Sequence, residues 1–175
     1  MIGNTIVGNQ IHLRAISDEL LVESNYIAWL NDPKVNKFLE TRHVVSTLET
    51  QRRFIHEINK SLDSLMYGIF CDKVFIGTIK VGPVNFHYFT AEVGLLIGNS
   101  DYWGRGIATE AIQLVSYASK QMFNLRKLTA GAYEANLGSV KAFLANGFNV
   151  EGRLKSQVLD EDNKPSDVII MGKIF

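Results

Sequence analysis

One segment constrains the fold of this chain more than any other: a strand-like run that leads through a glycine-rich turn into a long helix. Residues 92–98 have the aliphatic content of a strand, and apolar residues recur at helical spacing over residues 107–122. Gly104 and Gly106 lie between the two. Glycines leave the main chain uncovered, and the first turn of a helix has unpaired N–H groups. The segment therefore predicts an anion site suited to a diphosphate.

Other interpretations of this loop lead to different predictions. A dinucleotide site of the Rossmann type requires a third glycine where Thr109 stands, and an acid near the end of the next strand, but none precedes Glu134 there. A Walker loop requires Gly-Lys-Ser or Gly-Lys-Thr, which does not follow here. A plain glycine-rich turn without a ligand stays open as the alternative to the diphosphate site.

The composition indicates an ordinary globular protein. The 175 residues are 46% hydrophobic and 21% charged, enough for one domain with a sizeable core. Eighteen Lys and Arg balance eighteen Asp and Glu, so we expect neither a nucleic acid nor a membrane as partner. We also expect no leader peptide and no membrane span, because neither a basic n-region nor an apolar run of about 20 residues is present.

Cysteine and histidine usage narrows the chemistry further. Cys71 is the only cysteine, which excludes an internal disulfide and suits a reducing compartment, so we expect a cytoplasmic protein. The four histidines are scattered without metal-ligand spacing, and we expect no metal.

Turn and capping signals divide the chain into elements. Ser17 and the Asp32-Pro33 pair are typical of helix starts. The elements expected before the glycine-rich loop are a hairpin around Gly8-Asn9, helices over residues 17–30, 33–39 and 48–58, and strands over 66–71, 74–81 and 90–98. Those expected after it are the helix over 107–122, a strand over 128–133, a helix over 139–146 and two strands flanking 160–165. This order predicts a single α+β domain over residues 1–175.

The chain resembles the GNAT superfamily of acetyltransferases, in the RimJ/RimL-like branch. The family's signature is Arg/Gln-x-x-Gly-x-Gly/Ala, and residues 103–108 match it except that Trp103 replaces the leading residue. The segments that are also spaced as in that branch are residues 29–35, 102–111, 134–136 with Ser139, 146–148 and 151–152. The resemblance covers nearly the whole chain. It implies a mixed, mostly antiparallel twisted sheet of about seven strands flanked by helices.

The resemblance also implies acetyl-CoA as the cosubstrate. In this family the strand before the loop pairs its main chain with the pantetheine arm, and a backbone N–H polarises the thioester carbonyl. Asn136 corresponds to a side chain that hydrogen-bonds the pantetheine amides. The residues implied to bind acetyl-CoA are Val93, Leu95, Leu96, Ile97, Trp103, Gly104, Arg105, Gly106, Ile107, Ala108, Thr109 and Asn136.

Two side chains are candidates for proton transfer. Glu92 begins the strand before the loop, where related enzymes have a base, although a surface ion pair is the alternative. Many members of the family protonate the departing thiolate with a Tyr, but that position here is Phe143. Ser139 stands where RimL-like proteins have a proposed donor Ser, and capping the following helix is its alternative role.

The acceptor site of this family is built from the first two helices and a turn near the C-terminus. The residues expected to face the acceptor are Trp29, Asn31, Phe38, Glu40, Arg42 and His43. Arg42 stands out among them because an Arg fork suits a carboxylate or a phosphate. The acceptor we expect is a small primary amine such as a nucleotide-linked amino sugar, because the net charge is zero and because residues 30–33 and 40–42 resemble enzymes that acetylate amino sugars. Acetylation of a protein N-terminus and acyl-CoA binding without turnover stay open, as do a monomer and a homodimer.

Overall fold

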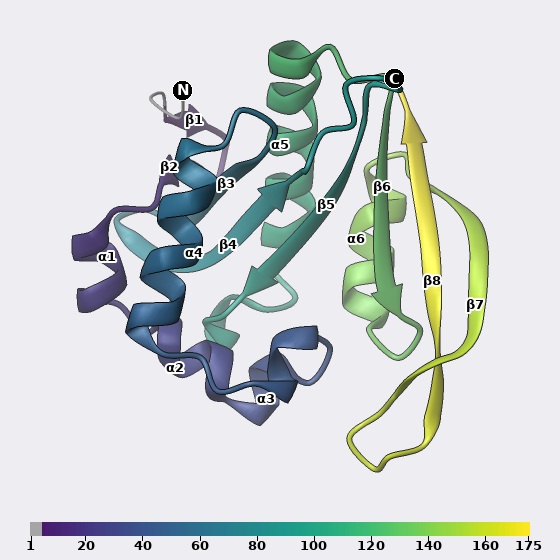
Figure 1. Ribbon diagram of the computed structural model, residues 1–175, viewed down its shortest axis with the longest axis horizontal. Helices are drawn as coiled ribbons and strands as arrows, with labels where there is room; N and C mark the ends of the chain where they lie inside the picture. Colours follow the sequence, from purple (N-terminus) through teal and green to yellow (C-terminus); the bar gives the residue numbers. More distant parts are fainter. Residues whose placement is uncertain (1–4) are drawn as a thin grey trace.

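The computed structural model describes residues 5–175, arranged as one mixed eight-stranded sheet flanked by helices (Figure 1). Met1 to Asn4, which belong to the segment where we expect no leader, lie outside the described residues. The strands are β1 (Ile6–Val7), β2 (Ile11–Ala15), β3 (Leu65–Cys71), β4 (Val74–Val81), β5 (Thr90–Ile97), β6 (Lys127–Tyr133), β7 (Asn149–Leu159) and β8 (Pro165–Ile174). The helices are α1 (Asp18–Glu23), α2 (Tyr26–Asn31), α3 (Pro33–Asn36), η1 (Glu40–His43), α4 (Leu48–Lys60), η2 (Ser100–Tyr102), α5 (Ile107–Phe123) and α6 (Leu137–Ala145).

The strand order is β1-β2-β3-β4-β5-β6-β8-β7. Every neighbouring pair is antiparallel except β5 and β6, which run parallel because α5 connects them across the sheet. The expected α+β class is confirmed. The short β1, set off from β2 by the Gly8-Asn9 turn, brings the expected seven strands to eight.

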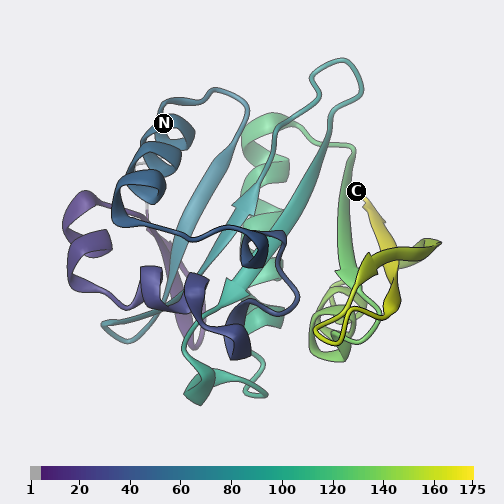
Figure 2. The same cartoon turned by 60° about the horizontal axis from the view of Figure 1, so that its bottom comes forward.

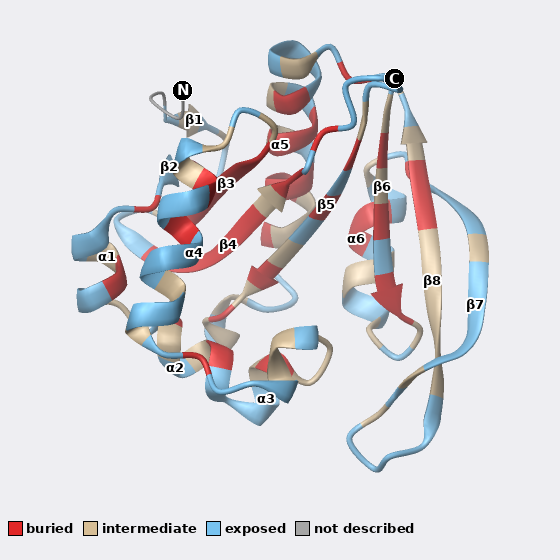
Figure 3. Cartoon of the chain, viewed as in Figure 1, coloured by how far each residue is buried: buried red, intermediate tan, exposed pale blue. Residues whose placement is uncertain are grey.

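Two apolar cores lie on opposite faces of the sheet. One holds residues of α1, α2 and α4 against β3, β4 and β5, and includes Leu21, Ile55 and Phe70. The other holds α5 and α6 against the opposite face, and includes Ile112 and Phe143. β3 and β4 are consequently buried almost throughout, whereas β7 is almost wholly exposed (Figure 3). In Figure 2, β6, β8 and β7 (green to yellow, on the right) lie to one side of helices α1–α4 (purple to blue, on the left).

The helix expected over residues 17–30 is two helices. Ser17 caps α1 as predicted, but Ser24 is extended, and the chain turns there before α2 begins. This break lets Leu21 of α1 and Leu30 of α2 reach one core. Asp32 caps α3, which ends at Asn36 rather than Leu39, where Asn36 Nδ2 donates a hydrogen bond to the Leu30 carbonyl at 2.8 Å.

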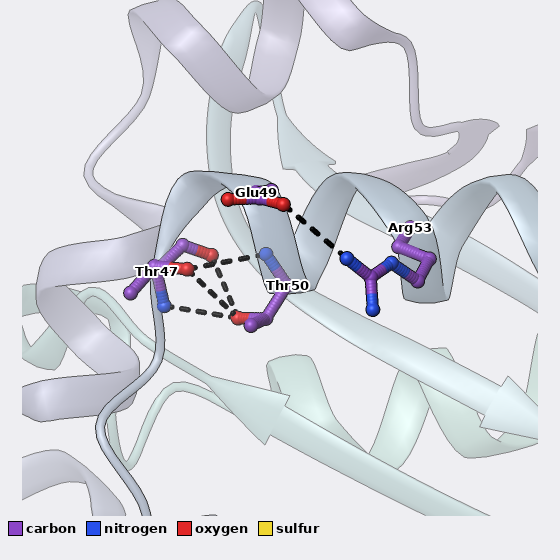
Figure 4. A network of polar contacts seen from close by, with 4 residues as sticks. All are labelled: Thr47, Glu49, Thr50 and Arg53. Carbon is purple, nitrogen blue, oxygen red and sulfur yellow. Dashed lines mark hydrogen bonds and ion pairs between the residues drawn. The ribbon is translucent and has the colours of Figure 1, made fainter.

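Helix α4 begins at a reciprocal capping box (Figure 4). Thr47 Oγ1 accepts from the Thr50 N–H at 3.2 Å, and Thr50 Oγ1 accepts from the Thr47 N–H at 3.0 Å. Two unpaired donors at the start of the helix are thereby satisfied. Ile55 faces the sheet from this helix and is buried, whereas Phe54 is 38% exposed.

Candidate functional site

The site forms where β5 and β6 part. The two parallel strands pair only from Thr90 with Lys127 to Glu92 with Thr129. Beyond these pairs β5 continues to Ile97 against β4, and β6 continues to Tyr133 against β8. The facing main chains of β5 and β6 therefore do not pair with each other beyond this point.

The register of β5 shows which residues direct their main chain into this opening. The Gly82 N–H donates to the Glu92 carbonyl, and the Gly98 N–H donates to the Ile76 carbonyl, both at 2.9 Å. Hydrogen-bonding direction alternates along an antiparallel strand, so every second residue of β5 faces β4 and the others face β6. The residues that face β6 are Val93, Leu95 and Ile97, the three expected to pair with a pantetheine arm.

The glycine-rich loop carries an open helix N-terminus. Gly104 has φ 73° and Gly106 has φ 81°, backbone conformations that favour glycine. Gly106 is the N-cap of the 17-residue α5, and no side chain of residues 5–175 caps its first turn. The exposed N–H groups and the helix dipole thus favour an anion there.

Trp103 has a role that the sequence pattern did not show. Its indole Nε1–H donates to the Ile97 carbonyl at 2.7 Å, so the side chain folds back over the end of β5. Lys34 of α3 lies above the indole ring, 5.6 Å from its centroid, and donates to Ser100 Oγ at 3.3 Å. Trp103 therefore joins the loop both to β5 and to α3.

A cavity of about 730 Å³ opens at this place, within the size range of small-molecule sites. Its lining is mainly apolar, and the expected cofactor-binding residues that contribute to it are Leu95, Leu96, Ile97, Trp103, Gly104, Gly106, Ile107, Ala108, Thr109 and Asn136. Val93 and Arg105 are not among them. The charged lining residues of the described chain are Lys34, Lys37 and Lys141, and none is acidic. A neutral chain thus presents local positive charge to this cavity, as a phosphate ligand requires.

Helix α6 supplies the opposite wall. Asn136 is its N-cap, with Oδ1 accepting from the Ser139 N–H at 3.2 Å. The capping role considered for Ser139 was therefore wrong, because Asn136 fills it and Ser139 is a cavity-lining residue of the first turn. Phe143 is 1% exposed and packs against Phe148 in the core, with ring centroids 5.0 Å apart.

Glu92 lies on β5 outside the cavity lining. Its side chain is exposed, on the face of β5 that Gly94 and Leu96 share. On the same face of the sheet, α1, α2 and α4 pack against β3 and β4. Glu92 is thus the last residue of β5 paired with β6, one residue before the strand opens.

Three of the expected acceptor residues have structural contacts. Trp29 packs on Phe75 with ring centroids 5.4 Å apart, and any side chain at Gly98 would overlap its indole. Asn31 joins α2 to the segment before α4, because its amide exchanges hydrogen bonds with the Ser46 main chain at 2.8 and 2.9 Å. The exposed His43 accepts a hydrogen bond from Arg42 Nε at 3.2 Å.

Glu40 and Arg42 meet a residue that the sequence analysis missed. Tyr133, at the end of β6, donates its hydroxyl to Glu40 Oε1 at 2.6 Å. Phe38 packs edge-on against the Tyr133 ring at 5.9 Å, and the Arg42 guanidinium lies 5.5 Å from the centroid of that ring. Burial, followed by the Glu40 carboxylate, raises the pKa of Tyr133 to about 12. No sequence signal links residues 40 and 133, because they are 93 positions apart.

Glu110 is a second residue that the sequence analysis missed. This buried carboxylate, in the first turn of α5, accepts hydrogen bonds from the main-chain N–H groups of Asn9 and Gln10. A Cβ at Gly8 would overlap one of its oxygens. Glu110 thereby anchors the β1–β2 turn beneath the glycine-rich loop.

Two further properties concern the described residues, 5–175. No group of three His, Cys, Asp or Glu side chains lies together there in a way that could hold a metal ion. None of the helices in that range is both long enough and apolar enough to cross a bilayer.

The sheet opens between β5 and β6 with an uncapped helix N-terminus beside the opening, an arrangement that suits an elongated ligand with a phosphate group. A family model of the acetyltransferase (GNAT) domain matches residues 10–149, and the chain belongs to this family. The resemblance to the GNAT superfamily inferred from the motifs is therefore confirmed.

Individual relatives agree with this assignment. The chain is 31% identical over 118 residues to a Bacillus subtilis protein named Probable N-acetyltransferase YjcK, a match that covers 64% of this chain and 65% of that protein. The chain thus spans about two thirds of the length of this relative.

Solved structures share the fold at low identity. A RimL ribosomal L7/L12 alpha-N-protein acetyltransferase in complex with coenzyme A superposes with a TM-score of 0.85 and 18% identity, covering 98% of each chain. Spermidine N-acetyltransferase from Vibrio cholerae, in complex with CoA and spermine, superposes with a TM-score of 0.83 and 19% identity. That match covers 94% of this chain and 95% of the other.

Proposed function

We propose that this protein transfers the acetyl group of acetyl-CoA to a primary amine by direct attack of the amine on the thioester. The observation that carries the proposal is the opening between β5 and β6 beside the uncapped N-terminus of α5. The open strand offers main-chain groups to a pantetheine arm, and the helix offers N–H donors to the diphosphate. The lysines of the cavity supply charge of the correct sign.

Glu92 is the proposed base. An alkyl amine is mainly protonated at neutral pH and must lose a proton before its nitrogen can attack. The new N–C bond then forms and the C–S bond breaks. The attacking nitrogen releases its second proton to solvent, and the thiolate takes up a proton. Ser139, which solvent then reprotonates, is the proposed donor of that proton, because it lines the cavity and its hydroxyl is not needed to cap α6.

The proposed acceptor is a small amine, with a nucleotide-linked amino sugar as its first candidate and a protein N-terminus as the second. RimL acts on a protein N-terminus, and the Vibrio cholerae relative acts on spermidine. The proposed setting is the cytoplasm, as a monomer or homodimer. Acyl-CoA binding without turnover is the competing function, favoured by the burial of Phe143 where many relatives have a Tyr.

An acceptor screen tests the proposal. Release of free thiol from acetyl-CoA is measured with glucosamine, a nucleotide-linked amino sugar, spermidine and a peptide with a free N-terminal Ser. We expect amine-dependent thiol release with at least one of them, and mass spectrometry should find the acetyl group on its nitrogen. Tight binding of acetyl-CoA in calorimetry, without thiol release for any amine, would support the binding function instead.

A further inference from the structure

The contact between Tyr133 and Glu40 joins two walls of the cavity. Phe38 and Leu39, which line one wall, directly precede Glu40. Ala135 and Asn136, which line the other wall, follow Tyr133. The hydroxyl-to-carboxylate bond therefore places the Glu40 carboxylate at the rim between the two walls, although Glu40 is not itself a lining residue.

Arg42 connects the 3-10 helix that carries Glu40 to two neighbouring elements. Arg42 Nη1 donates to the Lys37 carbonyl at 2.8 Å, and Arg42 Nη2 donates to the carbonyl of Leu159 at the end of β7. These bonds tie the 3-10 helix to the end of α3 and to β7. Within residues 5–175 Arg42 forms no ion pair with Glu40.

The Glu40 carboxylate is available for a cation. Glu40 is exposed, only its Oε1 has a hydrogen-bond partner within residues 5–175, and it forms no ion pair there. Tyr133 is 7% exposed and can only orient the carboxylate, since a hydroxyl carries no charge. The cavity beside it has three lysines and no acid in its lining. A cationic group that approaches the cavity is repelled by the lysines and attracted to this carboxylate.

We propose that Glu40, oriented by Tyr133, binds the ammonium group of the acceptor before that group loses its proton. This inference rests on the proposed function and assigns the acceptor as a primary amine that arrives in its charged form. Arg42 and Tyr133 are positioning residues, whereas Glu40 contacts the acceptor. Charge-assisted hydrogen bonds of this kind are about twice as strong as neutral ones, so the charge on Glu40 dominates the contact.

Binding without turnover tests the inference directly. The protein is saturated with CoA, and the amine that gives the highest turnover in the acceptor screen is titrated into the complex by calorimetry. We expect Glu40→Gln, which keeps an oxygen for Tyr133, to weaken amine binding about tenfold. Tyr133→Phe should weaken it about threefold, because only orientation is lost. Glu134→Gln is the matched control, since Glu134 is the next residue and its carboxylate pairs with Arg153 at 2.8 Å.

Kinetics separate failure of the inference from failure of the proposed function. Glu40→Gln should raise KM for the amine about tenfold, with kcat and the affinity for acetyl-CoA unchanged. Added salt should raise KM in the parent more than in Glu40→Gln, because the charge pair is screened. Amine-dependent turnover in the parent, together with parental KM and parental amine binding in Glu40→Gln, would overturn the inference alone. Absence of turnover with every amine would overturn the proposed function.

Discussion

The wall of the cavity formed by β5 and α5 differs from the wall formed by α3 and the residues that follow it, up to Leu39, in what each presents to a ligand. The first presents main-chain groups: the open edge of β5 and the uncapped first turn after Gly106. The second presents side chains, such as the Lys34 amine and the Phe38 ring, with the Glu40 carboxylate at the rim. The first wall is continuous in the chain, and the second depends on contacts with distant β6 and β7.

This difference predicts how each wall responds to substitution. Main-chain donors persist when a side chain changes, so the first wall fails only when its backbone is strained or its space is filled. Side-chain contacts fail when a single functional group is replaced. Substitutions that disturb the main chain are therefore expected to have larger effects than those that replace one side-chain group.

Gly106→Glu should abolish detectable binding of acetyl-CoA in calorimetry. The substitution places an anion at the helix N-terminus where the diphosphate is proposed to lie, and φ 81° adds strain for any side chain. Gly106→Ala separates the two causes, since it should lower stability by about 1 kcal/mol and keep measurable binding. Gly152→Glu, which adds the same charge in β7 with open space around its Cβ, should bind as the parent does. An unchanged affinity of Gly106→Glu for acetyl-CoA would show that the diphosphate does not bind at this loop.

Glu92→Gln should lower kcat about 10²-fold and leave the affinity for acetyl-CoA unchanged, because a general base acts on the amine proton alone. Steady-state kinetics from pH 6 to 9 measure the effect. Glu57→Gln is a control on an exposed carboxylate of α4, outside the cavity lining. A parental kcat over the whole pH range would assign the proton to water or to another group.

Ser139→Ala should lower kcat roughly tenfold to a hundredfold with no fall in the melting temperature. The Ser139 N–H that completes the α6 cap is kept in the alanine variant. Asn136→Ala is the contrasting variant, since it removes the cap and should lower stability by about 1 kcal/mol. Phe143→Tyr should not restore activity to Ser139→Ala, because residue 143 is buried against Phe148. An unchanged kcat in Ser139→Ala would exclude the hydroxyl as the proton donor.

Tyr133 should contribute a pH-dependent part of the stability at high pH. Burial and Glu40 raise its pKa from 10.0 to about 12, which favours the neutral phenol in the folded state. Its contribution is therefore complete below pH 10 and is lost as the pH rises from about 10 to about 12. An ultraviolet difference titration between the parent and Tyr133→Phe should show a midpoint near 12. A midpoint near the ordinary phenol value would contradict the buried contact with Glu40.

Local signals in the sequence account for most of the elements. Ser17 and Asp32 cap helices where the pattern placed them. Local signals did not predict the turns that tertiary packing imposes. The break between α1 and α2 occurs at Ser24 and Asn25, which carry no glycine or proline signal, because two apolar side chains on either side share one core.

The sequence by itself determined the family, the order of the elements and the loop for an anion, because each depends on residues close together in the chain. Gly104, Gly106 and the first turn of α5 act through their own backbone, so spacing alone identifies them. Only the tertiary structure decided that Asn136 rather than Ser139 caps α6, that Phe143 is buried, and that Tyr133 meets Glu40. The last contact brings together residues 93 positions apart, and chain spacing does not specify which side chains meet once the sheet has formed.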